Sequence, residues 1–216
     1  MKTDANYSDK FKKVYKEYYL LHPDGDSLPK SKFYYLHRQW FFPNHIDLVL
    51  ENIEKFHSRF YPKANKTIAL FAGLLHDAGL VYERIEISTE GHENRSCEYA
   101  KLILTKYDID SNLIEKICEA IKATNSNNPP TTEESLLVRN ADAYSHLTSL
   151  HFFAKAYFSN ELDYFINWFA KKIETTFNKL TIPELSNEIN PLIERYKLML
   201  ETYNKHKKEP LISSFS

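Results

Sequence analysis

The sequence has few of the residues that build cross-linked or sheet-rich proteins. Its 216 residues include only four glycines and two cysteines, Cys97 and Cys118. Two isolated thiols without a C-x-x-C spacing offer no disulfide framework and predict a reducing compartment. Because glycine is scarce while leucine, isoleucine, lysine and glutamate are plentiful, the composition favours an all-α fold over a sheet protein.

An excess of one charge and long apolar runs are also missing. The 28 basic and 29 acidic residues give a formal net charge of −1, which argues against long nucleic acid and anionic membranes as partners. No run of 18 apolar residues is available to cross a bilayer, and residues 1–13 are too polar for a signal segment. We therefore expect a cytoplasmic protein. Hydrophobic residues make up 43% of the chain, enough for a sizeable core.

Helical spacing of apolar residues recurs along most of the chain, with proline, glycine and asparagine clusters between the segments. Pro43 is expected to end one helix and Asn44 to cap the next. The polar, irregular stretch 80–92 predicts a mobile loop. The predicted helices cover about residues 8–21, 32–42, 44–60, 68–77, 93–106, 112–123, 133–158 and 161–177, followed by a last helical region to about 203.

The stretch Leu74-Leu75-His76-Asp77-Ala78-Gly79 organises the chemistry of the chain. The residues before it place apolar side chains at i, i+3, i+4 and i+7, as one face of a buried helix does. This helix delivers His76 and Asp77 side by side, just before Gly79, which can end it. Neither side chain is stable in a core without a partner. An imidazole and a carboxylate together make half of a site for a divalent metal.

Two residues far away in the sequence can supply the other half of this site. His45 opens a predicted helix beside a buried apolar stripe, and Asp142 lies among apolar residues of a long predicted helix. Two imidazoles and two carboxylates suit Mn, Fe, Co, Ni or Zn better than Mg or Ca. Four protein ligands around an octahedral ion would leave two positions, one for water and one for a substrate oxygen. A plainer alternative is a structural ion pair between Asp142 and a residue such as Arg139.

The ordered set H…HD…D in this sequence resembles the HD superfamily of metal-dependent phosphohydrolases. The resemblance covers about residues 40–155 and implies an all-α, single-domain helical bundle with a metal at its centre. In this picture residues 1–216 form one domain, in which helices of 8–42 and 160–203 pack on the HD-like core.

The same resemblance implies that four residues ligate one divalent metal ion: His45, His76, Asp77 and Asp142. Members with two metals usually carry two further histidines between the HD pair and the last aspartate. His92 could be one of them, but Thr124 stands where the other is expected, so a single ion is predicted.

Further residues are candidates through position or resemblance. The segment 91–96 is similar to a family segment that lines the pocket. We expect His92 and Glu93 to join Asp77 in catalysis, either by handling protons or by supporting the metal ligands through hydrogen bonds. Ordinary surface-loop roles for His92 and Glu93 are the alternative. Arg95 is expected to contact a phosphate of the substrate. Four other histidines are interpreted as structural or exposed: His37, His57, His146 and His151. Of these, His146 lies one helical turn beyond Asp142 and could therefore be near the site.

Hydrolysis of a phosphomonoester, phosphodiester or pyrophosphate bond in a small phosphorylated or nucleotide-like substrate is the function that these residues favour. The first alternative is a regulatory module that keeps the metal and a nucleotide pocket but has lost turnover. The second is a helical interaction protein in which the His–Asp pair is incidental, and the third is a metal-dependent oxygenase on a similar scaffold. The chain could act as a homodimer.

Overall fold

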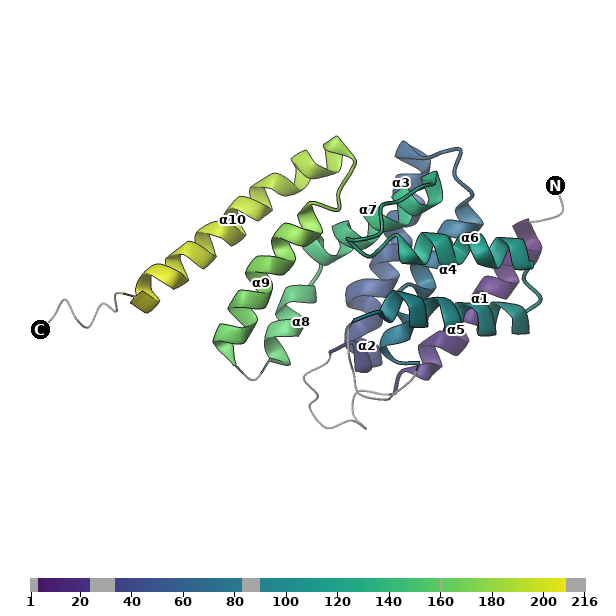
Figure 1. Ribbon diagram of the computed structural model, residues 1–216, viewed down its shortest axis with the longest axis horizontal. Coiled ribbons are helices and arrows are strands. Elements are labelled where there is room, and N and C mark those ends of the chain that lie inside the picture. The colour runs from purple at the N-terminus through teal and green to yellow at the C-terminus, as the bar shows by residue number, and fades with distance from the viewer. Residues whose placement is uncertain (1–3, 24–33, 83–89, 160, 209–216) are drawn as a thin grey trace, which may run out of the picture.

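The structure is a computed structural model, and it describes residues 4–23, 34–82, 90–159 and 161–208. These residues form helices and connecting turns without any strand, which confirms the predicted all-α fold (Figure 1). The α-helices are α1 (Asp4–Leu21), α2 (Arg38–Phe41), α3 (Asp47–Phe60), α4 (Lys66–Leu75), α5 (His92–Lys106), α6 (Ser111–Lys122), α7 (Glu133–Thr148), α8 (His151–Tyr157), α9 (Leu162–Phe177) and α10 (Pro183–Lys208).

Helix α4 lies at the centre of a core in which it contacts α1, α3, α5, α6 and α7. Its sequence is apolar on nearly every side, as expected of a helix that neighbours surround. Phe71, Leu74 and Leu75 are fully buried, and each contributes about 1.5–3 kcal/mol through burial. Asn65 caps the first turn, since its side-chain oxygen accepts from the Thr67 and Ile68 amides at 3.1 and 3.3 Å. The core therefore fixes the end of α4, from which the HD pair projects.

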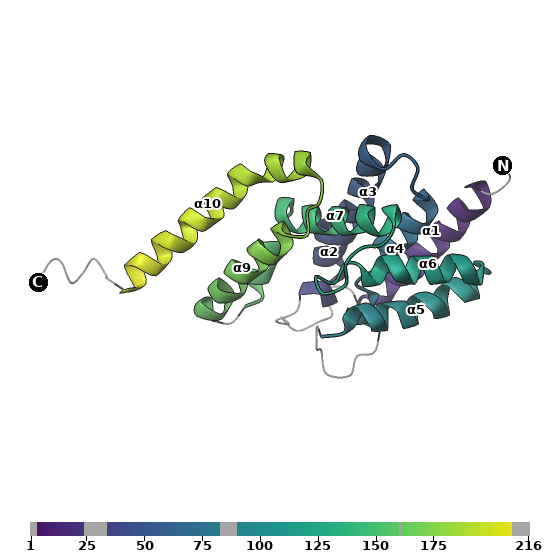
Figure 2. The ribbon, with the colours of Figure 1, turned by 45° about the horizontal axis from the view of Figure 1, so that its top comes forward.

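Helices α8, α9 and α10 form a second unit, which we call the C-terminal arm. Figures 1 and 2 show α9 and α10 side by side, with α10 running away from the core. The arm meets the core mainly through α7 and α9, and the Tyr144 hydroxyl donates to Glu188 at the start of α10, at 2.6 Å. Large apolar side chains such as Phe153 and Leu198 stay exposed on the arm. The assignment of 1–216 to one domain stays a prediction.

The prediction that Pro43 ends a helix and Asn44 caps the next is wrong. Residues Phe42–Ile46 form a π-helical turn that joins α2 to α3 without interruption. The Asp47 amide donates to the Phe42 carbonyl, five residues back. This widened turn accommodates a proline near its start, where the missing amide hydrogen costs little. Asn44 donates from its side chain to the Trp40 carbonyl at 2.7 Å instead of capping α3.

The predicted single helix over 133–158 is also wrong, because it is broken between α7 and α8. Ser149 adopts an extended backbone with φ −100° and ψ −177°. Its hydroxyl accepts from the His151 amide, the first of the second helix, at 3.1 Å. A serine side chain can replace a helical hydrogen bond of the backbone in this way. The apolar spacing around Ser149 gave no sign of this break.

Gly79 does not end α4, which already stops at Leu75. It lies in the 3-10 turn Ala78–Leu80, where the chain passes against the start of α5. A Cβ atom at this position would lie 2.6 Å from the Ser96 amide nitrogen and closer still to the His92 carbonyl oxygen. Glycine is therefore required for close approach rather than for a left-handed cap. The predicted mobile loop at 80–92 falls largely on residues 83–89, outside the described residues.

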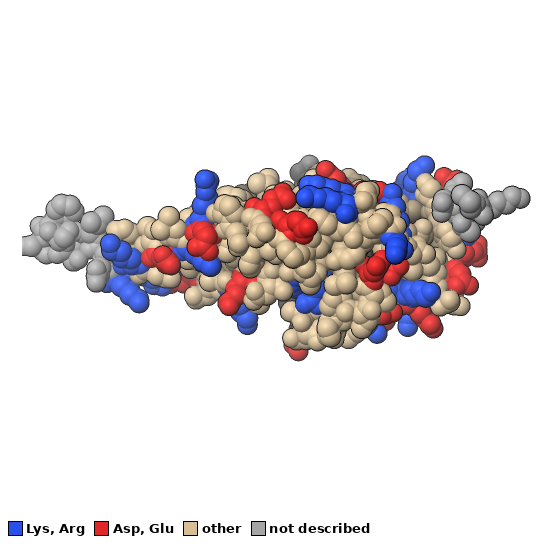
Figure 3. Space-filling model, turned by 90° about the horizontal axis from the view of Figure 1, so that it is seen from above, with Lys and Arg blue, Asp and Glu red and all other residues tan. Residues whose placement is uncertain are grey.

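The surface carries both charges without a large field of either sign on the face drawn in Figure 3, where acidic and basic side chains are interspersed. Within the described ranges, no helix combines the length and apolar character needed to cross a membrane.

Candidate metal centre

Three core elements bring His45, His76, Asp77 and Asp142 together. His45 comes from the π-helical turn before α3, His76 and Asp77 follow α4, and Asp142 projects from α7. The His45 Nε2 atom lies 3.0 Å from His76 Nε2, 3.2 Å from Asp77 Oδ2 and 3.6 Å from Asp142 Oδ1. The His76 Nε2 atom lies 3.6 and 3.5 Å from the same two carboxylate oxygens. All four side chains are buried, so their polar atoms face one another across a common point.

Hydrogen bonds on the far side of each imidazole orient the two rings. The Nδ1 atom of His76 lies 2.8 Å from the Gly73 carbonyl oxygen, which can only accept, so Nδ1 carries the hydrogen. The Nδ1 atom of His45 lies 3.3 Å from the Ser145 hydroxyl, which in turn donates to the His45 carbonyl. Both Nε2 lone pairs therefore face the common point, as in histidines that bind metals. At 3.0 Å the two lone pairs would repel, so the pair requires either a metal ion beside them or a proton on His76.

The electrostatics of the cluster favour bound positive charge. Burial opposes ionisation of Asp77 and Asp142, yet neighbouring groups, with His76 foremost for Asp77 and His146 for Asp142, hold the pKa of both carboxyls well below the usual range. Burial also opposes a charged His76, but the two carboxylates raise its pKa to about 9. Asp142 Oδ1 is buried without a hydrogen-bond partner among the described residues. The donor set, the lone pairs and this unsatisfied oxygen all fit a divalent metal ion.

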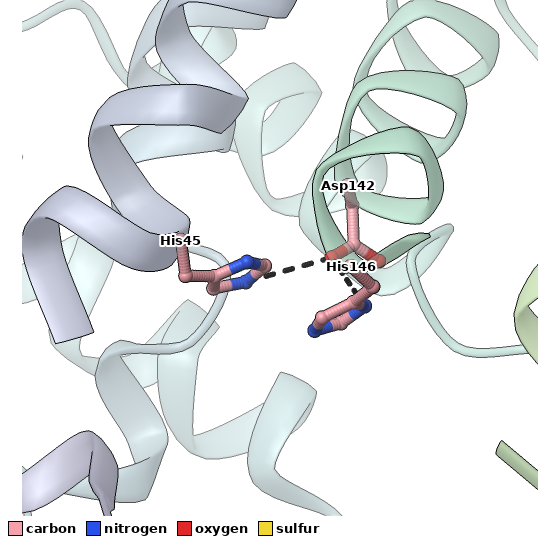
Figure 4. Close-up of side chains that lie close together, drawn as sticks. All are labelled: His45, Asp142 and His146. Carbon is pink, nitrogen blue, oxygen red and sulfur yellow. Dashed lines mark ion pairs between the residues drawn. The ribbon is translucent and has the colours of Figure 1, made fainter. Parts of the chain in front are cut away.

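Helix α7 adds a histidine whose position the sequence interpretation left open. His146 lies one turn after Asp142, and both side chains point toward His45 (Figure 4). The His146 Nδ1 atom is 3.4 Å from Asp142 Oδ1, and its ring stacks on that of His45 at 4.4 Å. His45, Asp142 and His146 form one group that could hold a metal, and His45, His76 and Asp77 form another. The i, i+4 spacing from Asp142 is the signal that identifies His146.

His92 and Glu93 lie beside the cluster at the start of α5. The His92 Nε2 atom is 3.2 Å from Asp77 Oδ1, and its Nδ1 atom is 3.4 Å from Glu93 Oε2. The Asn125 side-chain amide donates to the other Glu93 oxygen at 3.0 Å. A chain of polar contacts thus leads from Asp77 through His92 to Glu93. This geometry suits proton transfer, but the catalytic role of these residues stays a prediction.

Arg95 and Arg139 make other contacts than those considered from the sequence. The Arg95 guanidinium donates to the Gly79 and Glu90 carbonyl oxygens at 3.0 and 2.8 Å. Arg95 is absent from the described residues that line the pocket over the cluster, so its predicted phosphate contact gains no support from the structure. Arg139 donates to carbonyl oxygens of the connection between α6 and α7, including that of Asn128 at 2.9 Å. Among the described residues, no ion pair between Arg139 and Asp142 competes with a metal.

Comparison with protein-family models gives a match to the HD domain over residues 42–147. Residues 42–147 form a domain of the HD-domain superfamily. HD domains are in general metal-dependent hydrolases that bind divalent metals. No curated protein and no solved structure matches this chain. The match includes the four clustered residues and ends before the C-terminal arm.

A pocket of about 290 Å³ opens above the HD cluster. Core residues line it together with side chains of the arm, among them Trp168 and three lysines, Lys155, Lys172 and Lys179. The Lys179 ammonium lies 3.6 Å from Asp142 Oδ2, and burial together with Lys179 lowers the pKa of Lys172 to about 8. The sequence interpretation missed these lysines. The available signal for Lys172 is its position one turn after Trp168, on the inward stripe of α9.

Proposed function

We propose that the protein is a metal-dependent phosphohydrolase that acts on a small phosphate ester or nucleotide. The observation that carries this proposal is the cluster of two imidazoles and two ionised carboxylates, which converge at the base of a pocket containing three lysines. Such a cluster binds a divalent ion, and the lysines suit an anionic substrate. Membership of the HD superfamily supports the same class of reaction.

The proposed ligands are His45, His76, Asp77 and Asp142, with Mn, Fe, Co, Ni or Zn favoured over Mg. When bound, the ion would lower the pKa of a coordinated water and neutralise charge on the phosphoryl oxygens. The Gly73 carbonyl and the Ser145 hydroxyl keep the two imidazoles in the orientation that the ion requires.

The remaining polar residues are proposed to position the water and to move its proton. One Asp77 oxygen faces the ligand cluster and the other faces His92. Asp77 can therefore hold a water molecule between the ligand cluster and His92. His92 takes a proton from this water, assisted by Glu93, and the water oxygen attacks phosphorus. The bond from phosphorus to the leaving oxygen breaks, and that oxygen receives the proton. Ester and water thus become an alcohol and inorganic phosphate.

The pocket supports a small substrate with a planar part. Its volume of about 290 Å³ is close to the lower limit of about 300–1,000 Å³ for small-molecule sites. Tyr34, Tyr35 and Trp168 present aromatic rings on which a nucleotide base can stack. These features support a small nucleotide rather than long nucleic acid as the substrate.

A metal-content measurement combined with a substrate panel tests this function. The protein is purified without a histidine tag or chelator, its metals are measured, and it is assayed with Mn, Co, Ni, Zn and Mg on nucleotides, p-nitrophenyl phosphate and bis-p-nitrophenyl phosphate. We expect one equivalent of metal and metal-dependent release of product. Bound metal and bound nucleotide without turnover would favour the regulatory module, and protein without affinity for metal would contradict both.

A further inference from the structure

Two ammonium groups of the C-terminal arm face the metal cluster of the HD core. Lys172 comes from α9, Lys179 comes from the connection between α9 and α10, and both line the pocket with Asp77 and Asp142. The family match ends at residue 147, so these lysines lie outside it. No described residue forms a hydrogen bond or an ion pair with the Lys172 ammonium. A largely buried ammonium without such a partner is costly, which indicates that a ligand supplies one.

The charges of the pocket indicate how many negative charges this ligand brings. A divalent ion would balance the carboxylates of Asp77 and Asp142. Glu93, the remaining carboxylate among the described lining residues, is already contacted by His92 and by the Asn125 side-chain amide. Lys172 and Lys179 therefore bring two positive charges to the pocket that await a negatively charged ligand. A phosphomonoester carries about 1.5–2 negative charges near neutral pH, whereas a phosphodiester carries only one.

We propose, given the proposed function, that Lys172 and Lys179 bind the free oxygens of a terminal phosphate dianion, so that the arm selects phosphomonoesters over phosphodiesters. Lys179 lies beside Asp142 and therefore places its charge next to the ion, while Lys172 supplies the second charge. A phosphodiester offers one fewer free oxygen and carries a second ester group, which the ammonium groups cannot bind. In this arrangement the core performs the hydrolysis and the arm determines the substrate class.

Binding of inorganic phosphate tests this site without relying on turnover. The full chain with one equivalent of Mn²⁺ is titrated with phosphate by calorimetry, comparing wild type with Lys172→Met and Lys171→Met. Lys171 is adjacent on α9 but exposed, so it provides a matched control. Loss of one charged hydrogen bond is expected to weaken binding by about tenfold or more in Lys172→Met, with no change in Lys171→Met. Equal affinity in all three proteins would overturn the proposal.

Kinetics then test the preference for monoesters. Wild type is expected to cleave p-nitrophenyl phosphate with a kcat/KM at least about tenfold above that for bis-p-nitrophenyl phosphate, and Lys172→Met should reduce this ratio. Faster cleavage of the diester by wild type would also overturn the proposal. Phosphate binding that depends on Lys172, without hydrolysis of any substrate, would support the anion site and refute the proposed function. If Lys172→Met fails to fold, Lys172→Gln is compared with Lys172→Arg, and only the arginine variant should retain phosphate.

Discussion

The HD core and the C-terminal arm contribute to one pocket in opposite ways. The core supplies imidazoles and carboxylates from buried positions, with His45 and Asp142 only 0% and 2% exposed. The arm supplies ammonium groups from helices that meet the core mainly through α7. Large exposed apolar side chains are frequent on the arm, whereas close-packed aliphatic and aromatic residues surround the core cluster.

This difference indicates a division of labour. Metal ligands must be held within a few tenths of an ångström, which requires dense packing and a second layer of hydrogen bonds. Long lysine side chains act as point charges and tolerate a looser support. Substitutions in the core should therefore change stability or metal binding, whereas substitutions on the arm should change substrate binding. The following predictions are ordered from the largest expected effect to the smallest.

Asp142→Asn is expected to cause the largest loss, because it removes one of the two carboxylates that balance the ion. Substitution of a residue that only orients a metal ligand already weakens metal binding by about 10–100-fold. Because Asp142 is a proposed ligand itself, we expect its substitution to weaken metal binding by more than about 100-fold, with a parallel loss of turnover. Calorimetric metal titration measures the effect. Asp163→Asn, at an exposed position on the arm, is the matched control and should bind metal like wild type.

Gly79→Ala is expected to destabilise the core by about 3 kcal/mol, or about 6–12 °C in Tm, because backbone atoms of α5 occupy the space of the new methyl group. Gly91→Ala has open space, with its nearest neighbour at 3.8 Å, and only its φ of +67° opposes alanine. It should therefore cost about 1 kcal/mol. Thermal unfolding of the metal-free proteins measures the Tm of both variants. A larger decrease in Tm for Gly91→Ala than for Gly79→Ala would contradict the tight contact between Gly79 and α5.

Acid should destabilise the core through buried histidines such as His22. Burial lowers the pKa of His22 to about 4, and its Nδ1 lies 2.9 Å from the Tyr35 carbonyl oxygen. The unfolded chain binds the proton more tightly, so this contribution is complete above pH 6.5 and is lost as the pH falls toward 4. At pH 5 the loss amounts to about 2 kcal/mol. Urea unfolding measures how much the free energy of unfolding falls between pH 7 and pH 5. This fall should be smaller in His22→Gln than in wild type. It should equal that of wild type in His206→Gln, at the exposed end of α10.

Lys172→Met should have the smallest effect on stability. Replacing a partly buried charge by an apolar side chain of similar length is often neutral or stabilising, so the free energy of unfolding should change by less than about 1 kcal/mol in the absence of ligand. Urea unfolding of Lys172→Met and Lys171→Met provides the measurement. A loss above about 2 kcal/mol would show that Lys172 supports the fold instead of a ligand.

The sequence was most informative where the necessary signal is local. The helix before the HD pair has unbroken apolar spacing, so both the helix and the burial of His76 and Asp77 could be predicted. His45 and Asp142 each lie on an apolar helical face, and the family resemblance connected them to the pair. Their role as ligands, a homodimer and the cytoplasmic location stay predictions.

Features that depend on how distant helices pack were not predictable in the same way. Lys172 and Lys179 join the pocket only because α9 lies against α7, which the spacing within α9 does not reveal. The break at Ser149 depends on one side-chain hydrogen bond within an otherwise helical pattern. Pro43 was misinterpreted because a single proline is compatible with both a helix end and a widened turn.

The π-helical turn Phe42–Ile46 sets the rotational phase between two helices. Because each residue of an α-helix turns the chain by about 100°, a turn with one residue fewer would leave the inward faces of α2 and α3 out of step by about that angle. Either Phe41 or His45 would then swing away from the interior. Loops elsewhere in the chain tolerate changes in length. Deletion of one residue from the turn Phe42–Ile46, in contrast, would move a ligand out of the metal centre even if all four ligand residues were kept.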